Sequence, residues 1–537
     1  MILATVARRA QPLFCRARAA PTRHGRVVVD RRGLVNVLPS AVDESKLTRD
    51  LRMLIEKLGP MTVADYMGHA LQHPKHGYYT TQDEVIGPSG DFTTAPEISQ
   101  LFGEAVCVWC MSVWAEMGAP PNVRLVEMGP GKGTLMADLL RTAKSFPAFR
   151  SALEKGGVHL VETSPRLREK QCELLLKTQG GARLDPPPSQ AAASSVESGS
   201  APSSSSLLSA ELRDGLRVEW HGSLHDVPDD GPLLFIGQEL LDALPVHQFE
   251  CTAKGWRERL VELAKPGDAV PFRFVLASGD TPASRAYLRS APDGSVSGGG
   301  GRPKKLEELK ALLDFNAEPW RKAEVQAAQQ AQEAREEARE GEEASPRGEP
   351  NGSAAGSSEG DLAGGSMVGS AALWGGAAVG DELEVCPAAC ALVQDVAARL
   401  ARWRGGALLV DYGEDFALPN SLRAFHNHQE AHVLHRPGEF DLTADVDFAS
   451  IRRAVAHLEG VVCAGPVEQG QWLASMGCPE RLLKLIERDE CSDEEAERMV
   501  EAYERLVAPD QMGKRYKVLA LVDAKQSGPV PGGFDAP

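Results

Sequence analysis

Residues Val123 to Arg141 read VRLVEMGPGKGTLMADLLR, and this stretch decides the fold class. It begins as a short apolar run, turns through Gly129 to Gly133, and continues with leucines at helical spacing. A strand, a glycine turn and a helix in this order form the first unit of a parallel α/β sheet. Glycines at alternate positions allow the backbone to approach a ligand closely.

The spacing of the glycines excludes two common phosphate-binding loops. A dinucleotide fingerprint requires a third glycine where Thr134 stands. A Walker A loop requires a glycine five residues before the Gly-Lys pair, and Val126 stands there. It also requires Ser or Thr after the lysine, but Gly133 follows Lys132.

The remaining pattern is an acidic residue, Glu127, at the end of the strand, followed by Gly129, Gly131 and Gly133. This pattern is typical of class I methyltransferases, whose loop contacts the amino-acid and ribose parts of S-adenosylmethionine (SAM). A tight turn without a ligand is the alternative. A second predicted strand, residues 158–163, places Glu162 about thirty residues after the loop, where an acid binds both ribose hydroxyls in related α/β folds. The two features together favour a cofactor site.

Two later strands end in polar residues that belong to the same predicted site. The loop after the strand at 216–220 is where this fold usually holds the adenine, and Ser223 and Leu224 are candidate contacts; an ordinary connecting loop is the alternative. After the buried strand at 233–236, Glu239 and Asp242 could bind a cationic guanidinium through charge-assisted hydrogen bonds. Helix capping is the alternative for both acids. Glu97, in a predicted helix start, is a third and weaker candidate because a cap explains it as well.

Composition limits the function further. The 537 residues carry a net charge of −17, which argues against non-specific nucleic-acid binding. No apolar run approaches the length of a membrane span. We expect no metal site, because the histidines at 426, 428, 432 and 435 lie in an irregular loop. The sequence does not indicate the oligomeric state.

The chain divides into segments of different character. Residues 1–29 contain six arginines and no acid, which is typical of a mitochondrial transit peptide; a basic tail is the alternative. We predict a linker at 30–46, a helical region at 47–122 with a short strand near residues 78–81, and a methyltransferase domain at 123–525. Low-complexity insertions are predicted at 180–209 and 295–380, and a tail at 526–537.

Seven segments in order resemble the MidA-type SAM-dependent methyltransferases. They read GDFTTAPEISQLFGE, LVEMGPGKGTL, VETSPRL, QELLDALPVHQFE, GALLVDYGED, LTADVDF and MGKRYKVLALV. The resemblance spans roughly residues 47–522 apart from the insertions. It implies a class I fold, a Rossmann-like seven-stranded sheet with an N-terminal helical extension.

The mitochondrial branch of this family contains an arginine methyltransferase that assists assembly of respiratory complex I. The resemblance implies SAM as cofactor and symmetric dimethylation of an arginine in a core subunit of the complex I hydrophilic arm, in the mitochondrial matrix. Glu239 and Asp242 match the acids of the family motif, whereas Leu240 and Leu241 replace an aromatic pair and Gln238 replaces Asn or His. The alternatives are a methyltransferase for a small cation and a non-catalytic assembly factor that binds SAM.

Overall fold

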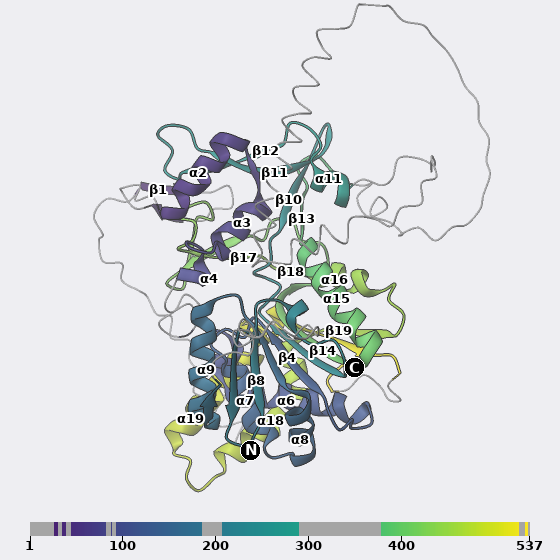
Figure 1. The fold of residues 1–537 in the computed structure, drawn as a ribbon. Coiled ribbons are helices and arrows are strands. Elements are labelled where there is room, and N and C mark those ends of the chain that lie inside the picture. Colours follow the sequence, from purple (N-terminus) through teal and green to yellow (C-terminus); the bar gives the residue numbers. More distant parts are fainter. Residues whose placement is uncertain are drawn as a thin grey trace, which may run out of the picture.

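The computed structural model describes residues 26–29, 35–38, 45–81, 87, 93–184, 207–288, 377–525 and 532–534. Most of the predicted leader and of both predicted insertions lies outside these residues. Figure 1 shows a lower lobe on a large twisted sheet and an upper lobe on a smaller sheet with helices α2, α3 and α4.

The centre of the lower lobe is a parallel sheet in the order β8-β5-β4-β9-β14. Strands β5 and β8 lie on one side of β4, and β9 and β14 on the other. The order in which strands are added to the sheet therefore reverses between β4 and β9. Sheets of this kind bind ligands at the carboxyl ends of the strands on either side of such a point. The strands are β4 (Arg124–Met128), β5 (Val158–Val161), β8 (Arg217–His221), β9 (Leu233–Gln238) and β14 (Gly405–Glu414).

Antiparallel strands complete both edges of this sheet. β20 (Tyr516–Asp523) pairs with β14, and β19 (Val461–Glu468) pairs with β20, which confirms the predicted closing strands of a seven-stranded sheet. At the other edge, β7 (Leu208–Leu212) and β6 (Gly181–Arg183) extend the sheet beyond β8. Both reach into the range 180–209 that the sequence assigned to an insertion. β6 is the exposed edge strand and pairs through its backbone, whereas β7 lies between β6 and β8 and buries Leu208, Ala210 and Leu212.

Helices cover both faces of the large sheet. Side chains alternate along each strand, so that Leu125 and Leu160 pack into the core on one face, and Val126 and Val161 into the core on the other. The first face carries α6 (Gln100–Glu116), α7 (Thr134–Ala143), α8 (Pro147–Gly156), α9 (Pro165–Gln179), α17 (Gln469–Ser475), α18 (Cys478–Ile486), α19 (Asp493–Val507) and α20 (Met512–Arg515). The second carries α15 (Pro387–Trp403) and α16 (Phe448–Val455).

The upper lobe was not predicted as a separate unit. Its sheet has the order β12-β11-β10-β13, with β3 beside β11, and it packs on α2 and α3 around a core of its own. The strands are β3 (Met61–Thr62), β10 (His247–Thr252), β11 (Gly255–Leu263), β12 (Phe272–Leu276) and β13 (Glu382–Val385); the helices are α2 (Lys46–Leu58), α3 (Val63–Gln72) and α4 (Tyr78–Thr81).

Two details of the sequence-based description were wrong. The predicted helical region at 47–122 is divided between the lobes, since α2 to α4 belong to the upper lobe and α5 (Ala95–Ile98) and α6 to the lower one. The predicted short strand near residue 80 is helix α4, in which Tyr78 is fully buried. The helix forms because Tyr78 packs into the core of the upper lobe, a contact with distant residues that the local sequence does not reveal.

Short elements complete the structure. A three-stranded sheet contains β15 (Arg423–His426), β16 (Gln429–Ala431) and β17 (Asp441–Thr443), while β18 (Val446–Asp447) pairs with β14. β1 (Arg26–Val29) and β2 (Val35–Leu38) form a hairpin across the predicted boundary between leader and linker. α11 (Pro282–Tyr287) flanks the upper sheet. Within the described part of the chain, no helix is long and apolar enough to cross a membrane.

Candidate active site

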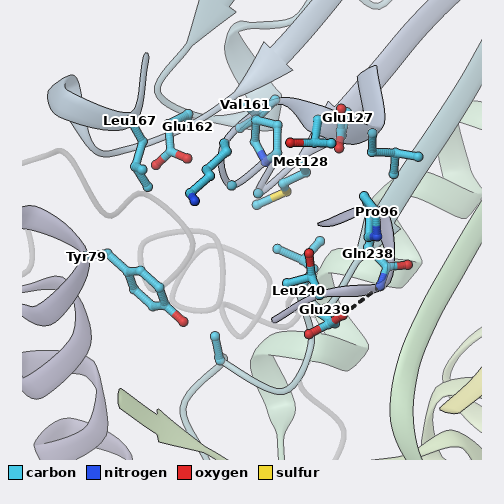
Figure 2. Close-up of a pocket in the computed structure, with 18 of the residues that line it drawn as sticks. Tyr79, Pro96, Glu127, Met128, Val161, Glu162, Leu167, Gln238, Glu239 and Leu240 are labelled. Carbon is cyan, nitrogen blue, oxygen red and sulfur yellow. Dashed lines mark hydrogen bonds between the residues drawn. The ribbon is translucent and has the colours of Figure 1, made fainter. Parts of the chain in front are cut away.

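A cavity opens at the carboxyl ends of β4, β5 and β9 and holds about 1100 Å³ of atom-free space, part of it open to solvent. Figure 2 shows residues of the lower lobe on one side of it and Tyr79 of α4 on the other. Five residues predicted from widely separated stretches of the sequence line it together: Glu127, Gly129, Gly131, Glu162 and Glu239. The predicted site is therefore one place in the fold.

The three glycines of the turn have left-handed backbone conformations. The φ angles of Gly129, Gly131 and Gly133 are 69°, 54° and 86°. A Cβ atom on Gly129 would lie 3.2 Å from Leu240, and one on Gly133 would lie 3.3 Å from Gln171. Glycine is thus required by conformation and by the close approach of two other elements. Gly133 is the N-cap of α7 and does not line the cavity itself.

Glu162 follows β5 and is held in place by α9. One carboxylate oxygen accepts the backbone N–H of Ser164 at 2.8 Å, and the other accepts the Gln171 amide at 3.2 Å. The same amide donates to the Gly131 carbonyl at 2.7 Å, while Trp220 donates to the Gln171 side-chain oxygen. Burial raises the pKa of Glu162 to about 6. Gln171 therefore joins the turn to the acid, a role that sequence reasoning missed because the residue sits mid-helix without a motif.

Glu127 is the most desolvated acid of the cavity. It is 2% exposed, its Oε2 atom has no hydrogen-bond partner, and burial raises its pKa to about 8. A buried carboxylate oxygen without a partner is costly unless a ligand supplies the donor.

Glu97 is more than a helix cap. Thr94 makes no side-chain capping bond at the start of α5. The Glu97 carboxylate instead accepts a hydrogen bond from the Thr134 hydroxyl and lies 3.9 Å from Lys132 Nζ. All three residues line the cavity. Glu97 thus ties the α5 segment to the glycine turn.

Glu239 occupies a strained turn directly after β9. Its φ angle is +49°, a left-handed value that is uncommon for residues other than glycine. Its N–H donates to the Val410 carbonyl at 2.8 Å, and its carboxylate accepts the Gln238 amide at 2.9 Å, as Figure 2 shows. Burial, followed by the nearby charge of Asp242, raises its pKa to about 8. The backbone strain is offset by these contacts and aims the carboxyl group into the cavity.

Asp411 organises the turn from β14. One of its oxygens accepts the backbone N–H groups of Leu240, Leu241 and Asp242 at 3.1, 2.8 and 3.3 Å. Its other oxygen accepts the N–H of Tyr412 at 2.9 Å. This side chain was not singled out from the sequence, because its partners lie about 170 residues away along the chain.

Asp242 is not among the residues that line the cavity. Its carboxylate accepts hydrogen bonds from Tyr412 and, at 2.7 Å, from Thr443. Its Oδ1 atom is buried without a partner. In this geometry Asp242 joins the turn to β14 and β17, and only Glu239 of the predicted pair reaches the cavity.

Comparison with known proteins decides what this site belongs to. The profile of a family described as "Putative S-adenosyl-L-methionine-dependent methyltransferase" matches residues 105–308 and 316–467. The chain belongs to this family. It is 33% identical over 480 residues to the mouse (Mus musculus) protein named "Protein arginine methyltransferase NDUFAF7, mitochondrial", with 89% of this chain and 84% of the relative covered. The human (Homo sapiens) protein of that name is 31% identical over 489 residues, covering 90% and 85%.

Solved structures support the fold of this SAM-dependent methyltransferase. A crystal structure of a Burkholderia thailandensis protein bound to S-adenosyl-homocysteine (SAH) superposes with a TM-score of 0.58. The two chains are 22% identical, and 91% of this chain and 92% of the other are covered. At this identity the likeness extends to the fold alone, which confirms the predicted class I architecture.

The residues of the methyltransferase fit its cofactor chemically. The unpartnered oxygen of Glu127 suits an ammonium donor, and Glu162 can accept hydrogen bonds from hydroxyl groups. Four apolar side chains of the cavity can pack against the adenine ring and the methionine chain of the cofactor: Met128, Leu135, Val161 and Leu167.

The predicted adenine residues lie apart from the cavity. Ser223 caps a single turn of 3₁₀ helix, accepting the N–H of His225 at 3.2 Å. Leu224 is buried, and its carbonyl accepts a hydrogen bond from Arg399. Neither side chain lines the cavity, although the loop that bears them begins directly after β8, whose last residue, His221, accepts the N–H of Glu162.

Tyrosines surround the acids where the family motif has its aromatic pair. Leu240 lines the cavity and Leu241 is buried in the core, so neither provides an aromatic wall. Tyr79 lines the cavity from the upper lobe and donates to Asp441 at 3.2 Å. Tyr412 and Tyr516 pack edge to face with ring centroids 5.4 Å apart. These residues come from other elements, so a motif at one place in the sequence could not reveal them.

Proposed function

We propose that this protein is a mitochondrial SAM-dependent protein arginine N-methyltransferase. The observation that carries the proposal is the position of Glu239, a half-buried carboxyl group that shares one cavity with the glycine turn of a methyltransferase family. The names of the relatives, which specify a mitochondrial protein arginine methyltransferase, support the choice of acceptor and compartment.

The cofactor is proposed to lie along the glycine turn. Gly129, Gly131 and Gly133 form the turn, Glu162 binds the ribose hydroxyls, and Glu127 faces the amino-acid part. Ser223 and Leu224 are kept as the adenine contacts, with the loop after β8 as the element that reaches the ring. Bound SAM would supply an electrophilic methyl group, and SAH would leave as the nitrogen–methyl bond forms. The chain itself would align the acceptor, balance charge and let the proton that the guanidinium nitrogen loses pass to Glu239 or to water.

Glu239 is the proposed acceptor-binding residue. A guanidinium group remains protonated in water and donates paired hydrogen bonds to a carboxylate. Entry of this cation into the buried site favours the ionised form of Glu239, and the carboxylate then orients one nitrogen toward the turn. Asp242 supports the reaction through the shape of the turn, which it anchors to Tyr412 and Thr443.

The finer assignment rests on the resemblance to the mitochondrial branch of the family. It comprises symmetric dimethylation, a core hydrophilic-arm subunit of complex I as acceptor, and location in the matrix. Residues 1–29 are proposed as the transit peptide that directs the chain there.

Calorimetric titration of the full chain with SAM and SAH, beside Glu162→Ala, tests the cofactor site. We expect saturable binding that the substitution weakens at least about tenfold, because two ribose hydrogen bonds are lost. Absence of binding by a folded sample would contradict both the enzyme and an assembly factor that binds SAM, whereas binding without methyl transfer to any acceptor would favour the latter.

Methyl transfer from labelled SAM to complex I subunit peptides tests the acceptor. Matched peptides carry arginine or lysine at one position, and mass spectrometry identifies the dimethylarginine isomer. Transfer to arginine alone is expected. Transfer only to free small amines would favour the small-cation alternative.

A further inference from the structure

Three metal-ligand side chains meet on the large sheet, outside the cavity described above. His159 lies on β5, and Glu219 and His221 lie on the neighbouring strand β8. His159 Nδ1 and His221 Nε2 are 3.0 Å apart, and Glu219 Oε2 lies 3.7 Å from the first and 3.9 Å from the second. Within the described part of the chain this is the group of three whose ligand atoms all lie within 4.8 Å of one another.

These separations match those of metal-bound donors. Ligands about 2.0–2.2 Å from one tetrahedral ion lie about 3.3–3.6 Å from each other. The three measured distances bracket that range, so small side-chain movements suffice to close the site. We propose that His159, Glu219 and His221 bind a divalent transition-metal ion, with Zn²⁺ as the ion that suits two imidazoles and one carboxylate.

The tautomers of the two histidines matter for metal binding. Both imidazoles are buried, at 4% and 0% exposure, and their facing nitrogens, His159 Nδ1 and His221 Nε2, share one hydrogen bond. A metal would need both of these nitrogens unprotonated, so the shared hydrogen would move to an outer ring nitrogen when the ion binds.

Charged groups surround the cluster. Arg217 holds the other oxygen of Glu219 at 2.7 Å and so orients the carboxylate. Asp226 lies close enough to His221 to favour a positive charge there. Arg124 opposes a cation, but Asp230 pairs with it at 2.6 Å and offsets its charge. Among the described residues, the outer ring nitrogens His159 Nε2 and His221 Nδ1 have no hydrogen-bond partner, so packing in the sheet holds the imidazoles.

A solvent hollow gives the ion a path to the cluster. His159 and Glu219 line it together with Arg124, Arg217 and Asp230, whereas His221 lies behind them and does not line it. The open side leaves room for water as a fourth ligand. A bound ion would join β5 to β8 next to the cofactor site, because the His221 carbonyl accepts the N–H of Glu162 at 2.9 Å. The expected role is a clamp on these strands.

Zn²⁺ titration of the metal-stripped full chain, followed by calorimetry and elemental analysis, tests the proposal. We expect one equivalent to bind, the melting temperature to rise, and amide hydrogen exchange in β5 and β8 to slow. His159→Gln and His221→Gln should each weaken binding at least about tenfold, and Glu219→Gln by about tenfold.

His247→Gln is the matched control. His247 also contacts a buried glutamate, Glu258, at 2.7 Å, but it is not part of a three-ligand group among the described residues. Its substitution should leave Zn²⁺ binding unchanged. Circular dichroism and SAH binding check that every variant is folded.

Co²⁺ provides an independent measurement on the unmodified protein. Visible absorption of tetrahedral Co²⁺ without a thiolate charge-transfer band is expected, since the proposed ligands are nitrogen and oxygen. A thiolate band would assign the ion to cysteines and overturn the proposal. No uptake of Zn²⁺ or Co²⁺, or equal uptake by the folded variants, would leave His159 and His221 as a hydrogen-bonded pair and refute the site.

Discussion

At the scale of single residues, burial gives Glu239 its proposed chemistry. A glutamate on the surface is ionised at neutral pH, whereas removal from water and the neighbouring charge of Asp242 raise the pKa of Glu239 to about 8. The empty site therefore holds a largely neutral carboxyl group, and a guanidinium supplies the charge that ionises it. This environment selects a cationic acceptor.

Glu239→Gln is expected to lower kcat at least about 100-fold and to leave SAH affinity within twofold, because the amide keeps the shape but loses the charge. Methyl transfer to an arginine peptide and SAH calorimetry measure the two effects. Glu430→Gln, on the exposed strand β16, is the control and should retain activity. Full turnover by Glu239→Gln would contradict the assignment.

The pH profile should carry the signature of the same carboxyl group. Since the ionised form binds the cation, kcat/KM for the peptide at saturating SAM should rise with pH and level off above about 8. Glu127 has a similarly raised pKa, but saturating SAM holds its site filled. If the rise of kcat/KM with pH is absent in Glu239→Gln, the rise comes from the Glu239 carboxyl group. An unchanged profile in this variant would exclude Glu239 as its source.

At the scale of secondary-structure elements, β14 shapes the turn after β9. Its Asp411 carboxylate gathers three backbone N–H groups of that turn, and its Val410 carbonyl accepts the N–H of Glu239. The parallel pairing of β9 and β14 brings these groups into register. The left-handed conformation of Glu239 thus depends on a strand that arrives more than 160 residues later.

Asp411→Ala would leave these N–H groups without their acceptor in a buried site. We expect the free energy of unfolding to fall by about 2–4 kcal/mol and kcat to fall more than SAH affinity. Denaturant unfolding, calorimetry and kinetics measure the three quantities. Asp415→Ala, which removes an exposed pair with Arg452, should cost under about 1 kcal/mol. Equal effects of the two substitutions would show that Asp411 does not position the turn.

At the scale of the whole molecule, the cavity belongs to both lobes. The lower sheet supplies the glycine turn, Glu162 and Glu239, while α3 and α4 supply Gln72 and Tyr79. The second predicted insertion leaves the upper lobe after Leu288 and returns near Leu383, and both residues pack in one small core with Phe249 and Ala283. Its two ends are therefore anchored in the same place.

Replacing residues 290–375 with a short Gly/Ser linker should preserve the fold, because the ends are already held together and loop length has a small entropic effect. We expect the melting temperature to change by only a few degrees and SAH affinity to stay within about twofold. Thermal unfolding and calorimetry measure both. Loss of SAH binding would assign the segment a part in the site.

The sequence by itself determined those features of the fold and the site that depend on residues close together along the chain. The strand, glycine turn and helix at 123–141 follow from local periodicity and from backbone freedom at Gly129, Gly131 and Gly133, and the acids at 127, 162 and 239 follow the ends of recognisable strands. Parallel strands of one sheet bring their carboxyl ends together, so these predictions converged on one cavity.

Only the tertiary structure decided the contacts that join distant parts of the chain. The sequence ranked Glu239 first and Asp242 second as acids that bind the acceptor, but it could not place them. Asp411 supports the turn that brings Glu239 to the cavity, whereas Asp242 is bonded to Tyr412 and Thr443 and does not line it. His159 and His221 are 62 residues apart and meet because β5 and β8 pair in one register. Strand order and register arise from packing of the whole core, and local sequence patterns do not encode them.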